Sequence, residues 1–163
     1  MSAADNIDVI VESAQWDALP DAAAVARNAV VQARVALDGR ADAGLAMLLT
    51  DDAAVRRLNA TWRGLDQPTN VLSFPAAAAG DSRHLGDIAI AFETTAREAR
   101  DEDKPLADHL AHLAVHGFLH LVGYDHETDA EAETMEQLER DILARLNVPD
   151  PYLAPTRAEA TGA

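Results

Sequence analysis

Three histidines lie within eleven residues of this chain, and their spacing restricts how that segment can fold. His116 and His120 are four residues apart, so a helix places both side chains on one face, one turn apart. Gly123 follows, and because glycine adopts positive φ without steric cost, it can end the helix and reverse the chain. His126 would then return toward the other two. Three neutral imidazoles with one open position are typical of a catalytic zinc site.

The histidine spacing also matches a protease signature, with one difference. In that signature a glutamate directly follows the first histidine and acts as the general base. Gly117 occupies this position here. The pattern therefore predicts a metal-dependent hydrolase and argues against a protease. The general base stays unassigned: the candidates are Asp125, Glu127 and Asp87, and a metal centre could also act without one. Asp125 is better suited to orienting a ligand imidazole or capping the turn.

The composition is consistent with an open metal site in a single domain. The chain has 163 residues and no cysteine, which excludes disulfides, thiolate ligands and the commonest closed zinc sites. No run reaches the ~20 apolar residues that span a bilayer, and the N-terminus lacks the features of a signal peptide. We expect one domain over residues 1–149, a flexible tail over residues 150–163, and a cytoplasmic location.

The distribution of charge bears on which partners can approach. The net charge of −15 opposes nucleic-acid binding, because phosphates attract lysine and arginine. Residues 51–90, however, carry four arginines against five acidic residues and are close to neutral. A polyanion would meet the least repulsion at this segment, which holds Arg56, Arg57, Arg63 and Arg83.

Hydrophobic patterning predicts an α/β (α+β) fold. Alternating or short apolar runs bounded by turn residues indicate strands at residues 7–12, 44–50, 69–74 and 86–92. Helical spacing and capping signals indicate helices at about residues 21–39, 52–62, 93–100, 106–121 and 129–146. Asp21 is the expected cap of the first helix, and Trp62 is expected to face inward from the second. The stripe of Met135, Leu138, Ile142 and Leu146 on the last helix is interpreted as core.

These elements predict a mixed sheet of about four strands packed with about five helices. Helical connections favour parallel pairing of the first three strands, and the loop at residues 76–83 favours antiparallel pairing of strands three and four. The helix at 106–121 should be the most buried one, because apolar residues surround its histidines. The metal site is therefore expected on a central helix and the turn after it.

Further histidines and one serine allow more than one interpretation. His109 and His112 share a helix face with His116 and His120, which could indicate a second metal. We favour the alternative that His112 lines the same cleft and His109 lies further out in solvent. His84, in the loop before the fourth strand, could reach the cleft or lie on the surface. Ser73 lacks a nucleophile-elbow pattern and is expected to be a strand residue near the cleft.

Two further stretches complete a recognisable set of motifs. One is LNATWRGLDQPTNVLSFP at residues 58–75, and the other is LGDIAI at residues 85–90. Together with the histidine run, they resemble the YbeY family of bacterial rRNA maturation factors, in the family's order and at similar separations. The resemblance covers about residues 45–147. Trp62 stands where tyrosine is frequent, and Gln67 stands where a basic residue is frequent, which weakens the expected phosphate contact.

The resemblance implies a single-strand-specific, zinc-dependent endoribonuclease that matures the 3′ end of 16S rRNA and acts in late 70S ribosome quality control. By motif position, His116, His120 and His126 correspond to the ligands of one Zn²⁺ per chain. Arg63 corresponds to the functionally important arginine, although from position alone it would be an ordinary surface residue. Arg63 and His116 are the candidate catalytic residues. The implied partners are single-stranded RNA, rRNA and the ribosome or its small subunit, with no membrane.

Two other functions stay open on the sequence. One is a metal hydrolase acting on a peptide or a small phosphoester. The other is a non-catalytic ribosome-assembly factor in which zinc only stabilises the fold, which would call for a fourth protein ligand. Three imidazoles favour zinc, although nickel or copper could also bind.

Overall fold

The computed structural model describes residues 6–37, 43–76 and 84–152. Its strands are β1 Ile7–Val11, β2 Gly44–Thr50, β3 Val71–Pro75 and β4 His84–Ala91. Its helices are α1 Ala22–Ala36, α2 Asp52–Arg63, α3 Phe92–Asp101, α4 Leu106–Val122 and α5 Asp129–Arg145, with a short 3-10 helix η1 Ala14–Ala18. The predicted fold class and order of elements are confirmed, and η1 was not predicted. Most of the expected loop at 76–83 and the expected end of the first helix near Gly39 fall outside the described residues.

The sheet is mixed, as predicted, but one pairing differs. Its order is β1-β2-β4-β3, in which β1, β2 and β4 run parallel and β3 is antiparallel to β4. The expectation that the third strand pairs in parallel with the first two is wrong. β4 takes the central place because Ile88–Ala91 are buried on both faces, whereas β3 carries Pro75, a residue suited to an edge strand.

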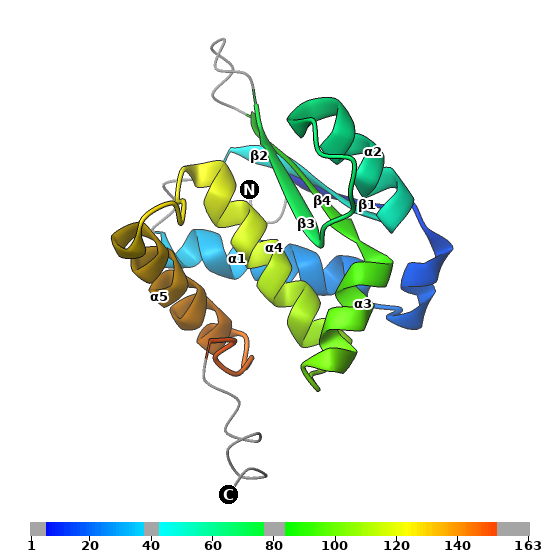
Figure 1. Cartoon of the computed structure of the whole chain (residues 1–163). Helices are drawn as coiled ribbons and strands as arrows, with labels where there is room; N and C mark the ends of the chain where they lie inside the picture. The colour runs from blue at the N-terminus through cyan, green and yellow to red at the C-terminus, as the bar shows by residue number, and fades with distance from the viewer. Residues whose placement is uncertain (1–5, 38–42, 77–83, 153–163) are drawn as a thin grey trace, which may run out of the picture.

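Side chains alternate along β4 and divide the interior between the two faces of the sheet. Ile88 and Ile90 join the large core formed with α1, α4 and α5, whereas Ala89 and Ala91 join a smaller cluster under α2. Helices α1 and α4 therefore cover one face and α2 covers the other (Figure 1). Except at the edges of the sheet, a side chain on the α2 face is separated from α4 by the sheet.

Helix α4 is the most buried of the described helices, as predicted, because its apolar residues contact both the sheet and other helices. It lies tightly against the sheet at Gly117. A Cβ at this position would lie 2.9 Å from Cγ2 of Ile88 and 3.2 Å from Oγ of Ser73. The glutamate of the protease signature could not occupy this position unless the neighbouring strand side chains or the helix itself shifted.

Local capping accounts for several helix ends. Asp51 caps α2 by accepting a hydrogen bond from the amide of Ala54 at 2.8 Å. Thr128 opens α5 with the predicted capping box. Asp21 takes the N-cap position of α1, as predicted, but its side chain makes no capping hydrogen bond there. At the end of α4, Gly123 adopts a φ of 111°, which turns the chain back as predicted.

One residue of α2, Trp62, is oriented differently from the prediction. Trp62 is 69% exposed, so the expectation that it faces inward is wrong. It lies on the last turn of the helix, beyond Val55 and Leu58, which join the cluster under α2.

None of the helices that the structure describes has both the length and the apolar content that a membrane crossing requires.

Candidate metal centre

The three predicted metal ligands converge on one point. His116 and His120 lie one turn apart on α4, and His126 follows the turn that Gly123 begins. The Nε2 atoms of His116 and His120 are 3.2 Å apart, and one ring nitrogen from each of the three histidines lies within 4.8 Å of the others. Two nitrogens bound tetrahedrally to one zinc at 2.0–2.1 Å are about 3.3 Å apart. The donor set therefore fits a zinc ion.

The cluster is open on the side of His126. His116 and His120 are half-buried, whereas His126 is exposed and its ring centroid lies 5.7 Å and 5.0 Å from theirs. Within residues 6–37, 43–76 and 84–152, no further histidine, aspartate or glutamate belongs to this group. Three protein ligands with a solvent-facing side are the arrangement of a catalytic site rather than of a closed structural one.

The protonation state of His120 suits a ligand. Burial lowers the pKa of His120, and the charges of His116 and His126 lower it further. A metal ligand must be the neutral imidazole, because the lone pair of the coordinating nitrogen has to be free. The burial of His120 therefore favours the form of this residue that binds a cation.

A carboxylate that the sequence analysis did not single out supports the cluster from α5. Glu139 is completely buried. Its Oε2 accepts a hydrogen bond from Nδ1 of His116 at 2.6 Å, and its Oε1 accepts one from Nε2 of His112 at 2.9 Å. The hydroxyl of Tyr152 also donates to Oε1. Burial alone would raise the pKa of Glu139, but these imidazoles outweigh that effect and hold its pKa at about 2.

The sequence did contain a signal for Glu139. This residue lies four positions after Met135 and three before Ile142, both of which are buried core residues. It is therefore an acidic residue at a core position of an amphipathic helix. Such residues are rarely buried unless they are paired, so the position itself predicts a partner.

Tyr152 lies where the sequence predicts a tail to begin. Burial raises the pKa of Tyr152, as does its hydrogen bond to Glu139, so the phenol keeps its proton and donates. Two contacts with Arg140 hold the same segment on α5: an ion pair of 3.1 Å with Asp150, and a guanidinium 5.5 Å from the Tyr152 ring centroid. Residues 153–163 of the predicted tail lie outside the described residues.

Arg63 reaches the open edge of the sheet. It is exposed at the end of α2, and its Nη2 donates to the carbonyl oxygen of Ser73 on the edge strand β3 at 3.2 Å. The hydroxyl of Ser73 donates in turn to the carbonyl of Gly117 at 2.9 Å. Ser73 therefore connects the arginine to the residue next to His116, and its own hydroxyl is engaged in packing the strand on α4.

The remaining candidate acids occupy different places. Asp125 accepts a hydrogen bond from the amide of His126 at 2.8 Å, so it caps the turn that carries this ligand. Asp87 lies 3.2 Å from Nε2 of His84, and both side chains are exposed. Strand alternation places Asp87 on the same face of the sheet as Ala89, the face away from α4. His84 is the first residue of β4, paired with Gly44, rather than part of the expected loop.

The two other histidines of α4, His112 and His109, are half-buried and buried, respectively. His112 is half-buried, with its ring centroid 6.3 Å from that of His116. His109 is 4% exposed, so the expectation that it lies in solvent is wrong. Helix α3 packs against this turn of α4 and places Glu98 2.9 Å from Nε2 of His109.

Buried His109 should make the metal-free protein sensitive to acid. Burial lowers the pKa of His109 below 6.5 despite the hydrogen bond with Glu98. The folded state therefore holds the neutral ring, and its stabilising contribution is present above pH 6.5 and lost as the pH falls below that value. We expect wild type to lose more stability than His109→Gln between pH 7.5 and 5.5, by at most about 1.4 kcal/mol per pH unit. Urea unfolding of both proteins in EDTA measures this difference, and parallel curves would contradict it.

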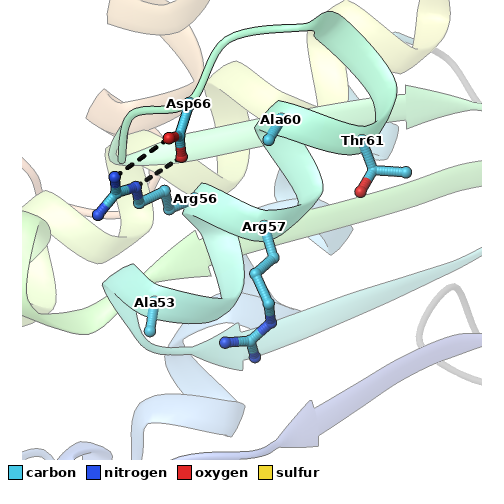
Figure 2. Close-up of a pocket in the computed structure, with 6 residues that line it drawn as sticks. All are labelled: Ala53, Arg56, Arg57, Ala60, Thr61 and Asp66. Atoms are coloured by element: carbon cyan, nitrogen blue, oxygen red, sulfur yellow. Dashed lines mark hydrogen bonds and ion pairs between the residues drawn. The ribbon is translucent and has the colours of Figure 1, made fainter.

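A surface hollow lies on the outer side of α2, separate from the histidines. It is lined by Ala53, Arg56, Arg57, Ala60, Thr61 and Asp66 (Figure 2). Nε of Arg56 donates to Asp66 at 2.7 Å, and Figure 2 shows both carboxylate oxygens turned toward this guanidinium. The hollow thus contains part of the least acidic segment, but Asp66 neutralises one of its two arginines. The sheet separates it from the metal centre.

The comparisons with known proteins agree with this geometry. The family model described as Endoribonuclease YbeY matches residues 10–147. The chain is 60% identical over 159 residues to an Endoribonuclease YbeY of Rhodopseudomonas palustris, covering 93% of this chain and 92% of the relative. It is 56% identical over 164 residues to that of Nitrobacter winogradskyi, covering 96% and 86%. The solution structure of a Thermotoga maritima protein matches with a TM-score of 0.53 and 22% identity, covering 91% of this chain and 99% of that one, which shows a shared fold.

Proposed function

Because this chain belongs to the YbeY family of metal-dependent endoribonucleases, we propose that its three-histidine centre cuts single-stranded RNA and that its cellular substrate is rRNA. The proposal includes maturation of the 3′ end of 16S rRNA on the small ribosomal subunit, late quality control of 70S ribosomes, and a cytoplasmic site of action. The observation that carries it is the 3.2 Å separation of the His116 and His120 Nε2 atoms, with His126 completing an open cluster.

We assign one zinc ion per chain to His116, His120 and His126. When bound, zinc acts as a Lewis acid toward a phosphate oxygen and lowers the pKa of water to about 7. The protein holds the three rings close together, keeps His120 neutral through burial, and leaves the side of exposed His126 open to a substrate. The open side is the feature that supports an endonucleolytic role better than a structural one.

Arg63 is suited to binding the scissile phosphate. A guanidinium has five N–H donors in a planar fork that matches phosphate oxygens. The hydrogen bond to the Ser73 carbonyl orients one side of this fork at the edge of β3, the strand on which α4 packs near Gly117. The segment around Arg63 is also the least acidic part of the chain, so an approaching RNA meets the least repulsion there.

The other two functions receive less support. Peptide hydrolysis of the protease type needs a glutamate at position 117, and a side chain there would meet Ile88 and Ser73. A purely structural zinc would call for a fourth protein ligand, and the part of the chain that the structure describes adds none to this cluster.

The purified protein should cleave an unstructured RNA and leave the same sequence intact in a duplex. Cleavage should stop after treatment with EDTA and return with equimolar zinc, since the ligands bind the ion reversibly. Arg63→Ala should cut at least ~10-fold more slowly with its zinc content unchanged, because it removes a phosphate contact but no ligand. Gel analysis of labelled RNA and metal analysis measure both effects.

Further arms of the same experiment separate the alternatives. Cleavage that survives EDTA would belong to a contaminating nuclease, whereas equal cleavage by Arg63→Ala would contradict the phosphate contact assigned to Arg63. Turnover of peptides without turnover of RNA would favour another hydrolase. Cells depleted of the protein should accumulate 16S rRNA with an extended 3′ end, and a normal end would contradict the proposed cellular role.

A further inference from the structure

The two ring nitrogens of His116 have different partners. Its Nε2 lies 3.2 Å from Nε2 of His120, at the point where the three ligands meet. Its Nδ1 lies 2.6 Å from Oε2 of Glu139 on the opposite side of the ring. A neutral imidazole has one N–H group, and an ionised carboxylate can only accept. The proton of His116 is therefore held on Nδ1, and Nε2 presents its lone pair to the cation.

Glu139 is itself fixed by two further donors. Its Oε1 lies 2.9 Å from Nε2 of His112 and accepts from the hydroxyl of Tyr152. The opposite nitrogen of His112, Nδ1, is buried without a hydrogen-bond partner, which is the state expected when the proton is on Nε2. With both oxygens engaged and no exposed surface, Glu139 has little freedom to turn away from His116.

We propose that Glu139 is a positioning residue of the metal centre and that Tyr152, from the C-terminal segment, holds it in place. Glu139 orients His116 and selects the tautomer that binds the ion. The residues from Asp150 to Tyr152 thus belong to the structural support of the metal centre, because Arg140 and Glu139 hold them on α5. This inference rests on the proposed zinc site. It predicts that a substitution of Glu139 lowers the affinity for zinc even in the absence of RNA.

The group of His112, His116 and Glu139 could also be interpreted as a second ion site. The contacts argue against that interpretation. The separations of 2.9 Å and 2.6 Å are hydrogen-bond distances, and they use both oxygens of Glu139. His116 would also have to lose the proton from both nitrogens to hold two ions at once. The stoichiometry of bound zinc distinguishes the two interpretations.

The test measures zinc affinity of the full chain by competition with a chromophoric chelator. Glu139→Gln keeps the shape of the side chain but replaces one acceptor with a donor, which opposes an imidazole N–H. We expect it to bind zinc 10–100-fold more weakly than wild type, with one ion per chain in both. The matched control is Glu133→Gln, which changes the same charge at an exposed position of α5 and should bind like wild type.

A milder variant keeps the test decisive if Glu139→Gln does not fold. Tyr152→Phe removes only the hydroxyl, and we expect zinc binding about threefold weaker because Glu139 keeps its two imidazole donors. The visible absorption bands of the cobalt-substituted protein should shift in Glu139→Gln and stay unchanged in Glu133→Gln. A general loss of stability would not produce this difference between folded proteins.

Several results would overturn the inference. Equal zinc affinity in wild type, Glu139→Gln and Tyr152→Phe would exclude a positioning role. Two zinc ions per wild-type chain would make Glu139 a ligand instead. Absence of zinc binding by wild type would overturn both this inference and the proposed zinc site. Zinc binding without RNA cleavage would overturn only the proposed function, while the affinity series would still decide the role of Glu139.

Discussion

Replacing His120 with alanine should reduce cleavage of single-stranded RNA at least ~100-fold and remove stoichiometric zinc. The described residues supply three ligands to the cluster and no fourth, so the loss of one leaves two imidazoles to hold the ion. His120 is half-buried at the end of α4, and its removal deletes no apolar core side chain. The metal-free variant should therefore stay folded. Initial rates on a labelled RNA, metal analysis and circular dichroism measure the three effects.

His84→Ala is the matched control for this prediction. His84 is exposed, begins β4 and pairs with Asp87, whose side chain lies on the face opposite α4. The variant should therefore cut RNA and bind zinc like wild type. If His120→Ala loses its zinc but still cleaves at the wild-type rate, the histidine cluster is not the catalytic centre.

Gly86→Ala should destabilise the fold by at least ~3 kcal/mol, the largest effect on stability that we expect from a single methyl group added at any glycine that the structure describes. Gly86 has a φ of 147°, which side chains rarely adopt. A Cβ there would lie 2.2 Å from the carbonyl oxygen of Phe74 and 2.9 Å from Cδ2 of Leu121. Neither β3 nor α4 can give way easily, because the backbone of Phe74 is paired in the sheet and Leu121 is buried.

Gly64→Ala separates backbone strain from crowding. Gly64 also has a positive φ, 70°, at the end of α2, but nothing lies within 4 Å of the position that a Cβ would take. Only the cost of the left-handed conformation applies, so we expect about 1 kcal/mol. Urea unfolding of both variants measures the difference. Equal losses at the two positions would show that crowding between β3, β4 and α4 is not what Gly86 avoids.

The convergence of the three histidines could be predicted because their geometry is local. Two of them are separated by one turn of a single helix, and the third follows a turn that a glycine makes possible within a few residues. The same holds for the capping box of α5, which depends on residues three positions apart. These features need no knowledge of how distant elements pack.

Predictions that depended on packing were less successful. The buried environment of His109 arises because α3 lies against α4, which helical periodicity alone does not reveal. Trp62 has the spacing of an inward-facing residue, but the apolar residues by which α2 packs on the sheet, Val55 and Leu58, lie on its earlier turns. β3 pairs at the edge because β4 has the apolar residues on both faces that a central strand needs.

By itself, the sequence determined the histidine cluster, the order of helices and strands, and the membership of the family, because each depends on residues close together in the chain or on motifs in a set order. The tertiary structure decided which carboxylate accepts the hydrogen bond from Nδ1 of His116. Glu139 is 23 residues away from it in the chain and meets it only because α5 packs on α4. Backbone geometry sets contacts over one or two turns of a helix, whereas contacts between helices depend on how side chains from distant segments fill a common core.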